Sequence, residues 1–320
     1  MGSYTRAGLA GVGVTCGVLL LAVSVGNNGD GDKTTSTQPK GAAAAAPPKG
    51  PYVALGDSYT AGPKVPSQAG RPAGCERSDH NYPALVAEKL EIDAADFRDM
   101  SCSGATLADL SAPQHTDNGV NPAQLSALSG STRLVTIGIG GNDIGFSSLV
   151  KNCVKQGALY VATGSGKYTG NDAPCKGKYV SGGTDEVRQR IQAAGERLAD
   201  TLNEVKQRAP KARVYVVGYP SILPDKGKDC DDDMTLAPDD ATFLNDKEQQ
   251  LNSALRQRAA DAGAGYVDTY TPSAGRDACS ARETRWTEPL IPAAPAAPVH
   301  PNERGERGMA DAVLRTVKGS

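Results

Sequence analysis

The sequence is poor in aromatic residues and has no excess of either charge. It contains three Phe, one Trp and eleven Tyr among 320 residues, so its core must be built mainly from Ala, Val, Leu and Ile. Its 34 Lys and Arg nearly balance 36 Asp and Glu, which gives little support for electrostatic binding of nucleic acid. Gly (37) and Pro (21) stay below the share at which disorder becomes the default. We therefore expect a folded protein whose partner is a small or neutral molecule.

Several motifs of well-known enzyme sites are also missing. The chain has no Gly-x-Ser-x-Gly, which removes the signature of an ordinary α/β-hydrolase. It has no Cys-x-x-Cys and no His-x-x-x-His, so closely spaced metal ligands are absent from the sequence. The segment 164–168 resembles a phosphate loop, but Tyr168 stands where a Mg²⁺-binding Ser or Thr is needed.

The N-terminus carries an apolar run, Gly8–Val25, behind a single Arg6. This pattern predicts a signal peptide over residues 1–26; the alternative is an uncleaved membrane anchor, because the run approaches the roughly 20 residues that span a bilayer. Residues 27–50 lack apolar periodicity and indicate a flexible linker or prosegment. Residues 51–320 suit one α/β domain. We expect a secreted, extracellular monomer that contacts membrane only through the N-terminal segment, if it is retained.

The seven cysteines support export. Cys16 lies inside the apolar run and is removed with the signal, which leaves an even number, as expected for disulfides in an oxidising compartment. Six cysteines allow 15 pairings. Of these we favour the pairing of neighbours along the chain: Cys75–Cys102, Cys153–Cys175 and Cys230–Cys279.

Short β-branched runs alternate with helical patterns along the domain. Strands are expected at 52–55, 97–100, 133–137, 212–217 and 265–268. Helices are expected near 82–91, 184–208, 239–262 and 303–317, whereas 153–183 and 221–238 are interpreted as surface insertions held by disulfides. Repeated strand, helix, strand order predicts a parallel sheet with right-handed crossovers. In such a sheet, ligand sites lie at the carboxyl ends of the strands.

Ser58 follows the first strand and is a candidate nucleophile. Gly56 would let the backbone turn sharply there, and Asp57 is expected to hold the turn by accepting backbone N–H bonds. An ordinary helix cap is the alternative for this Gly-Asp-Ser. A serine nucleophile needs a base. His300 lies just before the last helix, where Pro301 biases its backbone towards an extended form that could project the ring over the strand ends. Its late place in a doubly wound fold, with an early serine, favours it over a plain loop histidine; the other two histidines lie in polar loop sequence.

An acyl-transfer site also needs donors for the developing oxyanion. Candidates are the Ser58 N–H, the Gly104 N–H after the second strand and the Asn142 side-chain amide after the third. Taken singly, Gly104 fits a turn glycine and Asn142 an Asx-turn residue. Their joint arrival on the edge that carries Ser58 favours the catalytic interpretation.

These residues resemble the four blocks of the SGNH (GDSL) hydrolase family, over about residues 50–318. The blocks are Gly56-Asp57-Ser58, Gly104, Gly140-Gly141-Asn142-Asp143 and His300. The six-cysteine framework, Gly-Asp-Ser-Tyr-Thr-Ala-Gly and Trp286-Thr-Glu-Pro-Leu are similar to the secreted actinobacterial lipase and esterase branch. The resemblance implies a three-layer αβα sandwich around a flavodoxin-like, doubly wound parallel sheet of about five strands. It implies no metal and no cofactor.

The resemblance also implies roles for single residues. Ser58 would be the nucleophile, His300 the general base, and Ser58, Gly104 and Asn142 the oxyanion hole. The family usually places Asp three residues before the histidine, where this chain has Ala297. We therefore expect a Ser–His dyad in which the Ala297 backbone carbonyl orients His300. Carboxylates that could substitute are Glu288, Glu303 and Asp277.

The predicted function is a secreted serine ester hydrolase that forms an acyl-Ser58 intermediate. The branch resemblance implies fatty-acyl lipid esters, whereas the residues alone imply only an ester. Alternatives with the same site are a phospholipase A, a glycan deacetylase or an acyltransferase. An inactive surface binding module is the alternative of another class, with the missing aspartate as its main support. Because the chain has three Phe, an acyl pocket would be lined mostly by aliphatic residues and Tyr.

Overall fold

The computed structural model describes residues 47–163, 172–225, 230 and 234–319, all within the compact unit 44–320. The predicted signal peptide and most of the predicted linker lie outside these residues. Within them, every helix is too short or too polar to traverse a bilayer.

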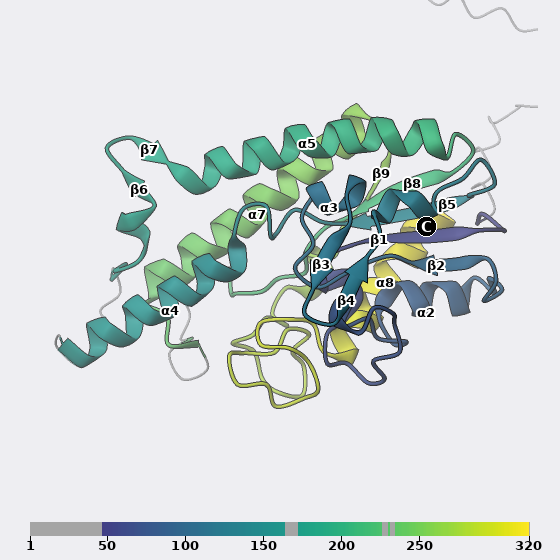
Figure 1. The fold of residues 1–320 in the computed structure, drawn as a ribbon. Helices are drawn as coiled ribbons and strands as arrows, with labels where there is room; N and C mark the ends of the chain where they lie inside the picture. The colour runs from purple at the N-terminus through teal and green to yellow at the C-terminus, as the bar shows by residue number, and fades with distance from the viewer. Residues whose placement is uncertain (1–46, 164–171, 226–229, 231–233, 320) are drawn as a thin grey trace, which may run out of the picture. The chain divides into compact units, whose positions relative to one another are not determined.

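A five-stranded parallel sheet forms the centre of the fold (Figure 1). Its order is β2-β1-β5-β8-β9, which is the flavodoxin-like order 2-1-3-4-5 when only sheet strands are counted. The strands are β1 (Tyr52–Gly56), β2 (Phe97–Asp99), β5 (Leu134–Gly138), β8 (Arg213–Val217) and β9 (Gly265–Val267). β1 and β5 are buried throughout, as expected for parallel strands covered on both faces. The predicted fold class is confirmed.

Alternate residues of β1 enter two different cores, and this produces three layers. Val53 and Leu55 belong to the core beneath α5 and α7, whereas Tyr52 and Ala54 belong to the core beneath α2 and α8. Figure 1 shows α5 and α7 on one side of the sheet and α2 and α8 on the other. Their bounds are α2 (Tyr82–Lys89), α5 (Glu186–Arg208), α7 (Pro238–Asp261) and α8 (Glu303–Lys318).

Three of the four predicted helices, α2, α5 and α8, begin at a side-chain cap, whereas α7 begins after Ala237 without one and has Pro238 in its first turn. In α5, Asp185 accepts a hydrogen bond from the Arg188 amide (2.9 Å) and caps the N-terminus. The buried side of α5 repeats at three- and four-residue spacing, from Val187 to Val205. Asn302 caps α8 in the same way, with its side chain accepting from two amides of the first turn.

The interpretation of 153–183 as an irregular insertion is wrong in its first part. Helix α4 runs Phe146–Thr163, and its buried residues Phe146, Leu149, Val150, Cys153 and Gly157 follow a helical period that begins before residue 153. After the residues that are not described come η3 (Lys176–Lys178) and a two-stranded hairpin, β6 (Val180–Ser181) and β7 (Thr184–Asp185). A second hairpin joins β3 (Gln114–Thr116) to β4 (Gly119–Asn121). Further short helices among the described residues are α1 (Ser58–Ala61), η1 (Ala73–Cys75), α3 (Ala108–Ser111), η2 (Gln124–Ala127) and η4 (Thr271–Ser273).

Three disulfides join neighbours along the chain, in the pairing expected from the sequence. They are Cys75–Cys102, Cys153–Cys175 and Cys230–Cys279. The first joins η1 to the loop after β2, and the second joins α4 to the segment before η3. The first therefore fixes the loop at the carboxyl end of β2, and the second holds the segment before η3 against α4.

Candidate active site

Ser58 is the first residue of α1, with only Asp57 between it and the end of β1, and it is nearly buried. Asp57 caps this short helix: its side chain accepts from the Tyr59 amide (2.9 Å), which confirms the expected role. The need for Gly56 has a different cause from the one expected. Gly56 has no positive φ; instead, a Cβ there would lie 2.5 Å from the Gly138 carbonyl of β5. Glycine thus lets two strand ends approach closely beneath the serine.

His300 lies beside Ser58 although 242 residues separate them. Its Nε2 is 2.8 Å from the Ser58 Oγ, and its Nδ1 is 2.8 Å from the Pro298 carbonyl oxygen. Since a carbonyl can only accept, Nδ1 carries the proton and Nε2 is the free base that accepts from the serine. Burial lowers the pKa of His300 below its ordinary value of 6.5, which favours this neutral form.

The carbonyl that orients His300 differs from the one expected. Nδ1 donates to Pro298, whereas the Ala297 carbonyl accepts the His300 backbone N–H (3.2 Å). The tight turn at Val299, which has a φ of 62°, folds the ring back over the carbonyl two residues earlier. A β-branched residue in this region is strained and is held there only by its surroundings.

The three carboxylates considered as substitutes are all bonded elsewhere. Glu303 pairs with Arg307, and Asp277 accepts from the Cys279 amide. The fully buried Glu288 accepts from the Asn302 side chain (2.7 Å) and from the backbone amides of Ala293 (2.8 Å) and Ala294 (3.2 Å). Glu288 therefore fastens the loop that carries the histidine without contacting the ring.

Tyr59 holds this loop from the serine side. Its hydroxyl donates to the Val299 carbonyl (2.6 Å), and its ring lies 4.9 Å from the His300 ring, centroid to centroid. The residue after the candidate nucleophile thus touches both the strained turn and the candidate base. Sequence reasoning missed this role, because nothing in Gly-Asp-Ser-Tyr-Thr indicates a contact 240 residues away.

The oxyanion candidates surround the same edge. Gly104 has a φ of 78°, which favours glycine, and the neighbouring Ser103 amide donates to the Cys75 carbonyl (3.1 Å). The Asn142 amide donates one N–H to the Ala105 carbonyl (2.9 Å), which links the loops after β5 and β2 and leaves its second N–H for a ligand. Among described residues, no acceptor pairs with the Ser58 or Gly104 backbone N–H. Gly104 does not itself line the cavity described below. It is connected to the site through the next residue, Ala105, whose carbonyl accepts from Asn142.

Tyr219 is a further site residue that sequence reasoning did not name. Its hydroxyl donates to the Asp57 carboxylate (2.5 Å) and accepts from the Gly141 amide (2.7 Å). It thereby joins the loops after β1, β5 and β8. Burial raises the pKa of Asp57 to about 7, although the bonds from Tyr219 and the Tyr59 amide oppose the shift. The signal was available, since Tyr219 also follows a strand of the sheet.

A cavity of about 240 Å³ opens beside Ser58 and His300. Its polar lining includes Asn142, Tyr59 and Tyr219, together with the ionisable residues Lys151 and Glu248. The larger share of the wall is apolar, from Phe146, Val150, Ile222, Leu251, Leu290 and Val299. Two of these residues, Phe146 and Val150, belong to α4. A helix that the sequence analysis did not predict therefore forms part of the cavity wall.

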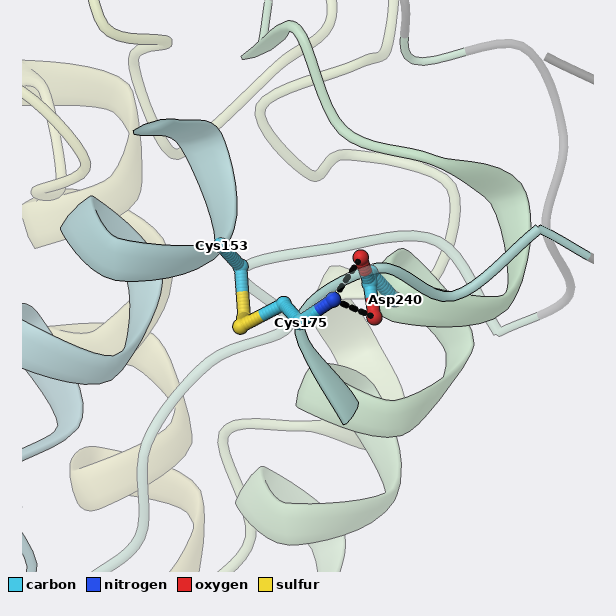
Figure 2. A group of neighbouring side chains, drawn as sticks. All are labelled: Cys153, Cys175 and Asp240. Atoms are coloured by element: carbon cyan, nitrogen blue, oxygen red, sulfur yellow. Dashed lines mark hydrogen bonds between the residues drawn. A yellow bond between two sulfur atoms is a disulfide. The ribbon is translucent and has the colours of Figure 1, made fainter. Parts of the chain in front are cut away.

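One group of metal-ligating residue types occurs among the described residues: Cys153, Cys175 and Asp240 (Figure 2). The two sulfurs are joined in a disulfide, and both Asp240 oxygens accept from the Cys175 amide (3.0 and 3.3 Å). One of them also accepts from the Lys176 amide (2.8 Å). Disulfide sulfurs are not thiolate ligands. The group therefore fastens the segment before η3 to the first turn of α7.

The αβα fold, with Ser58 and His300 in contact at the carboxyl edge of the sheet, is that of an SGNH-type hydrolase. The chain belongs to the GDSL-like Lipase/Acylhydrolase family, whose model matches residues 54–307, and the predicted resemblance is confirmed. It is accordingly a carboxylic ester hydrolase. It is 39% identical to Lipase 2 of Streptomyces coelicolor over 78% of this chain and 80% of that protein. It is 30% identical to an esterase of Streptomyces scabiei over 77% of each chain.

Two solved structures are similar throughout the domain. The phospholipase A1 of Streptomyces albidoflavus has a TM-score of 0.66 and 28% identity, covering 84% of this chain and 99% of that one. The extracellular lipase of Streptomyces rimosus has a TM-score of 0.67 and 28% identity, covering 83% and 99%. The fold is therefore shared with a phospholipase A1 and with an extracellular lipase.

Proposed function

We propose that the protein is a secreted serine esterase that hydrolyses fatty-acyl esters through an acyl-Ser58 intermediate. The observation that carries this proposal is the 2.8 Å contact between the Ser58 Oγ and the unprotonated Nε2 of His300, at the wall of an apolar cavity. A nucleophile and base within hydrogen-bond reach, with the base oriented by a third group, is the pattern of nucleophilic catalysis. The retained pair argues against an inactive binding module.

The reaction follows from these atoms. Ser58 Oγ attacks the ester carbonyl carbon while its proton passes to His300 Nε2, and the Nδ1–H stays bonded to Pro298. The Ser58 and Gly104 amides and the free N–H of Asn142 stabilise the negative carbonyl oxygen. The alcohol leaves with the proton from Nε2. Water then attacks the acyl-serine in the same way, which releases the acid and restores Ser58.

The lipid part of the proposal rests on the cavity wall. Its apolar residues offer hydrocarbon contact for an acyl chain, worth about 0.8 kcal/mol for each CH₂ that leaves water. The expectation of an aliphatic and tyrosine lining agrees with the wall, to which Phe146 is the sole Phe contributor among the described residues. A phospholipase A is the second candidate, favoured by the similarity to the phospholipase A1 structure.

The location and processing of the chain form part of the proposal. Secretion is supported by the relationship to an extracellular lipase and by the three disulfides, which persist mainly in oxidising compartments. We propose the boundaries 1–26 for the signal, 27–50 for the linker or prosegment, and 51–320 for the catalytic domain, acting as a monomer.

The decisive experiment measures hydrolysis of p-nitrophenyl esters from acetate to palmitate by the wild type and by Ser58→Ala and His300→Ala. We expect rates to rise beyond acetate and to fall on the order of 10³-fold or more in both variants. Absence of Ser58-dependent turnover at every chain length would refute the mechanism. A maximum at acetate would refute the fatty-acyl assignment alone. Fatty-acid release from phosphatidylcholine tests the phospholipase alternative.

A further inference from the structure

The loop that precedes His300 is uncharged and partly exposed. We call Pro289–Val299 the rim loop. It contains no Asp, Glu, Lys or Arg, in a chain of which 22% is charged. Ile291 is 85% exposed, the largest value among the large apolar side chains described. In Figure 1 this loop belongs to the irregular lobe between β9 and α8. A single exposed apolar side chain is common on protein surfaces, so its meaning here depends on where it lies.

The rim loop is continuous with the acyl cavity. Leu290, Ala297, Pro298 and Val299 all line the cavity, and Ile291 follows Leu290 directly. One stretch of chain therefore passes from the cavity wall to the exterior. An acyl chain that leaves an apolar phase beside Ile291 would reach Leu290 along uncharged residues of the loop, although the exposed Arg282 donates to the Ala293 carbonyl of the same loop (3.0 Å).

The backbone of the rim loop is also suited to an apolar phase. Four of its eleven residues, at every third position from 289 to 298, are proline and have no N–H to desolvate. Four further amides are bonded within the protein: those of Ala293 and Ala294 to the Glu288 carboxylate, that of Ala297 to the Pro63 carbonyl and that of Val299 to the Glu288 carbonyl. Eight of the eleven positions therefore have no free N–H, which lowers the cost of placing the loop in hydrocarbon; among the described residues, no acceptor pairs with the amides of Leu290, Ile291 and Ala296.

We propose that the rim loop docks the protein onto the surface of aggregated lipid, with Ile291 inserted among the acyl chains, so that substrate passes directly into the cavity. The inference rests on the proposed function only for its lipid substrate. A lipid surface fits better than a protein partner, because protein hot spots favour Trp, Tyr and Arg, and the rim loop has none of them. The rigid bonding through Glu288 means that docking needs no rearrangement of the loop.

The test separates docking from catalysis by using Ser58→Ala protein collected from the culture medium. Co-sedimentation with phosphatidylcholine vesicles is compared with and without Ile291→Ser. We expect the partition coefficient to fall about tenfold, since an exposed Ile loses its lipid contact without changing the fold. Val180→Ser is the matched control, because Val180 is 37% exposed but lies on β6, far from the lobe in Figure 1. We expect this control to bind vesicles as strongly as the Ser58→Ala parent.

A second readout locates the contact. An environment-sensitive fluorophore attached to Ile291→Cys should shift to the blue on addition of vesicles, and the same label on Val180→Cys should not. In protein with intact Ser58, Ile291→Ser should slow hydrolysis of emulsified esters about tenfold but change that of dissolved p-nitrophenyl butyrate less than twofold. Equal partition of Ile291→Ser and its parent, or equal shifts at both labels, would refute docking. Since the Ser58→Ala protein is inactive by design, that result would leave the esterase proposal standing.

Discussion

The two halves of the Ser58–His300 pair are built in different ways. Ser58 stands at the end of a buried strand of the parallel sheet, and its turn is fixed by a cap and by the close approach of Gly56 to β5. His300 stands in the irregular loop before α8, after the strained Val299. That loop keeps its shape through side chains brought from elsewhere, Glu288 and Tyr59.

The difference teaches where the precision of the site comes from. The regular hydrogen bonds of the sheet position the nucleophile. The turn at Ser58 should therefore open only when the core itself unfolds. The base depends on a few tertiary bonds, because Pro and Ala supply little packing of their own. Variants that remove those bonds should therefore harm the site through His300 while the sheet stays intact.

The largest effect is expected for Glu288→Ala. This change leaves the buried amides of Ala293 and Ala294 and the Asn302 side chain without their acceptor, and Arg285 without its buried carboxylate 3.6 Å away. We expect kcat/KM for p-nitrophenyl butyrate to fall at least about 10²-fold, as misplaced catalytic groups do. The free energy of unfolding, measured in urea, should fall by about 3–5 kcal/mol.

Glu303→Ala provides the control for this prediction, since Glu303 was an equal candidate acid in the sequence. Its exposed carboxylate pairs with Arg307 on the first turns of α8. Such a pair contributes about 0.3–0.5 kcal/mol, so activity should stay within twofold. Similar small losses in both variants would show that the loop does not depend on Glu288.

Tyr219→Phe tests the serine half and should have the second-largest effect. Loss of the hydroxyl leaves the Gly141 amide without its acceptor and removes a donor from the buried Asp57. We expect kcat to fall about 10- to 30-fold and stability to fall by about 1–3 kcal/mol. The pKa of Asp57 should rise above its present value of about 7, which carboxyl NMR titration measures. Tyr179→Phe, whose hydroxyl accepts from Asn152 near η3, should leave activity unchanged; an equal loss there would contradict a local role.

The same comparison explains what the sequence could predict. The five strands, Ser58 and Asn142 follow from β-branched runs and from the rule that sites lie at strand ends. His300 was found because it was the one histidine placed beside the last helix. Its orienting carbonyl was assigned to Ala297, since a spacing rule cannot represent the turn at Val299. Helix α4 was not predicted because its apolar period begins at Phe146, before the segment 153–183 that was interpreted as an insertion from its Gly and Lys content.

Tyr59→Phe should have a smaller effect, because it removes one bond of the His300 loop and keeps the ring against the imidazole. The lost bond is the 2.6 Å contact from the hydroxyl to the Val299 carbonyl. We expect kcat to fall about three- to tenfold with little change in KM, as for a positioning group that does not bind substrate. The kcat of Tyr59→Ala should fall further, because this change also removes the ring packed on His300. Equal kcat values for Tyr59→Phe and Tyr59→Ala would mean that the Tyr59 ring does not help to position His300.

The smallest effect concerns the pH at which His300 acts. Only its neutral form accepts the serine proton, and burial lowers the pKa of His300 below 6.5, so kcat/KM should fall as the pH drops through a midpoint below 6.5. Ala297→Asp places a carboxylate three residues before His300 and should raise the pKa of His300, which moves that midpoint to higher pH. Ala297→Asn adds similar bulk without charge and should leave the midpoint in place. If both variants moved it equally, the loop geometry, and not the charge, would control the base. The irregular loop around His300 would then set its pKa as well as its position. Ser58 differs in this respect, because the regular sheet positions it.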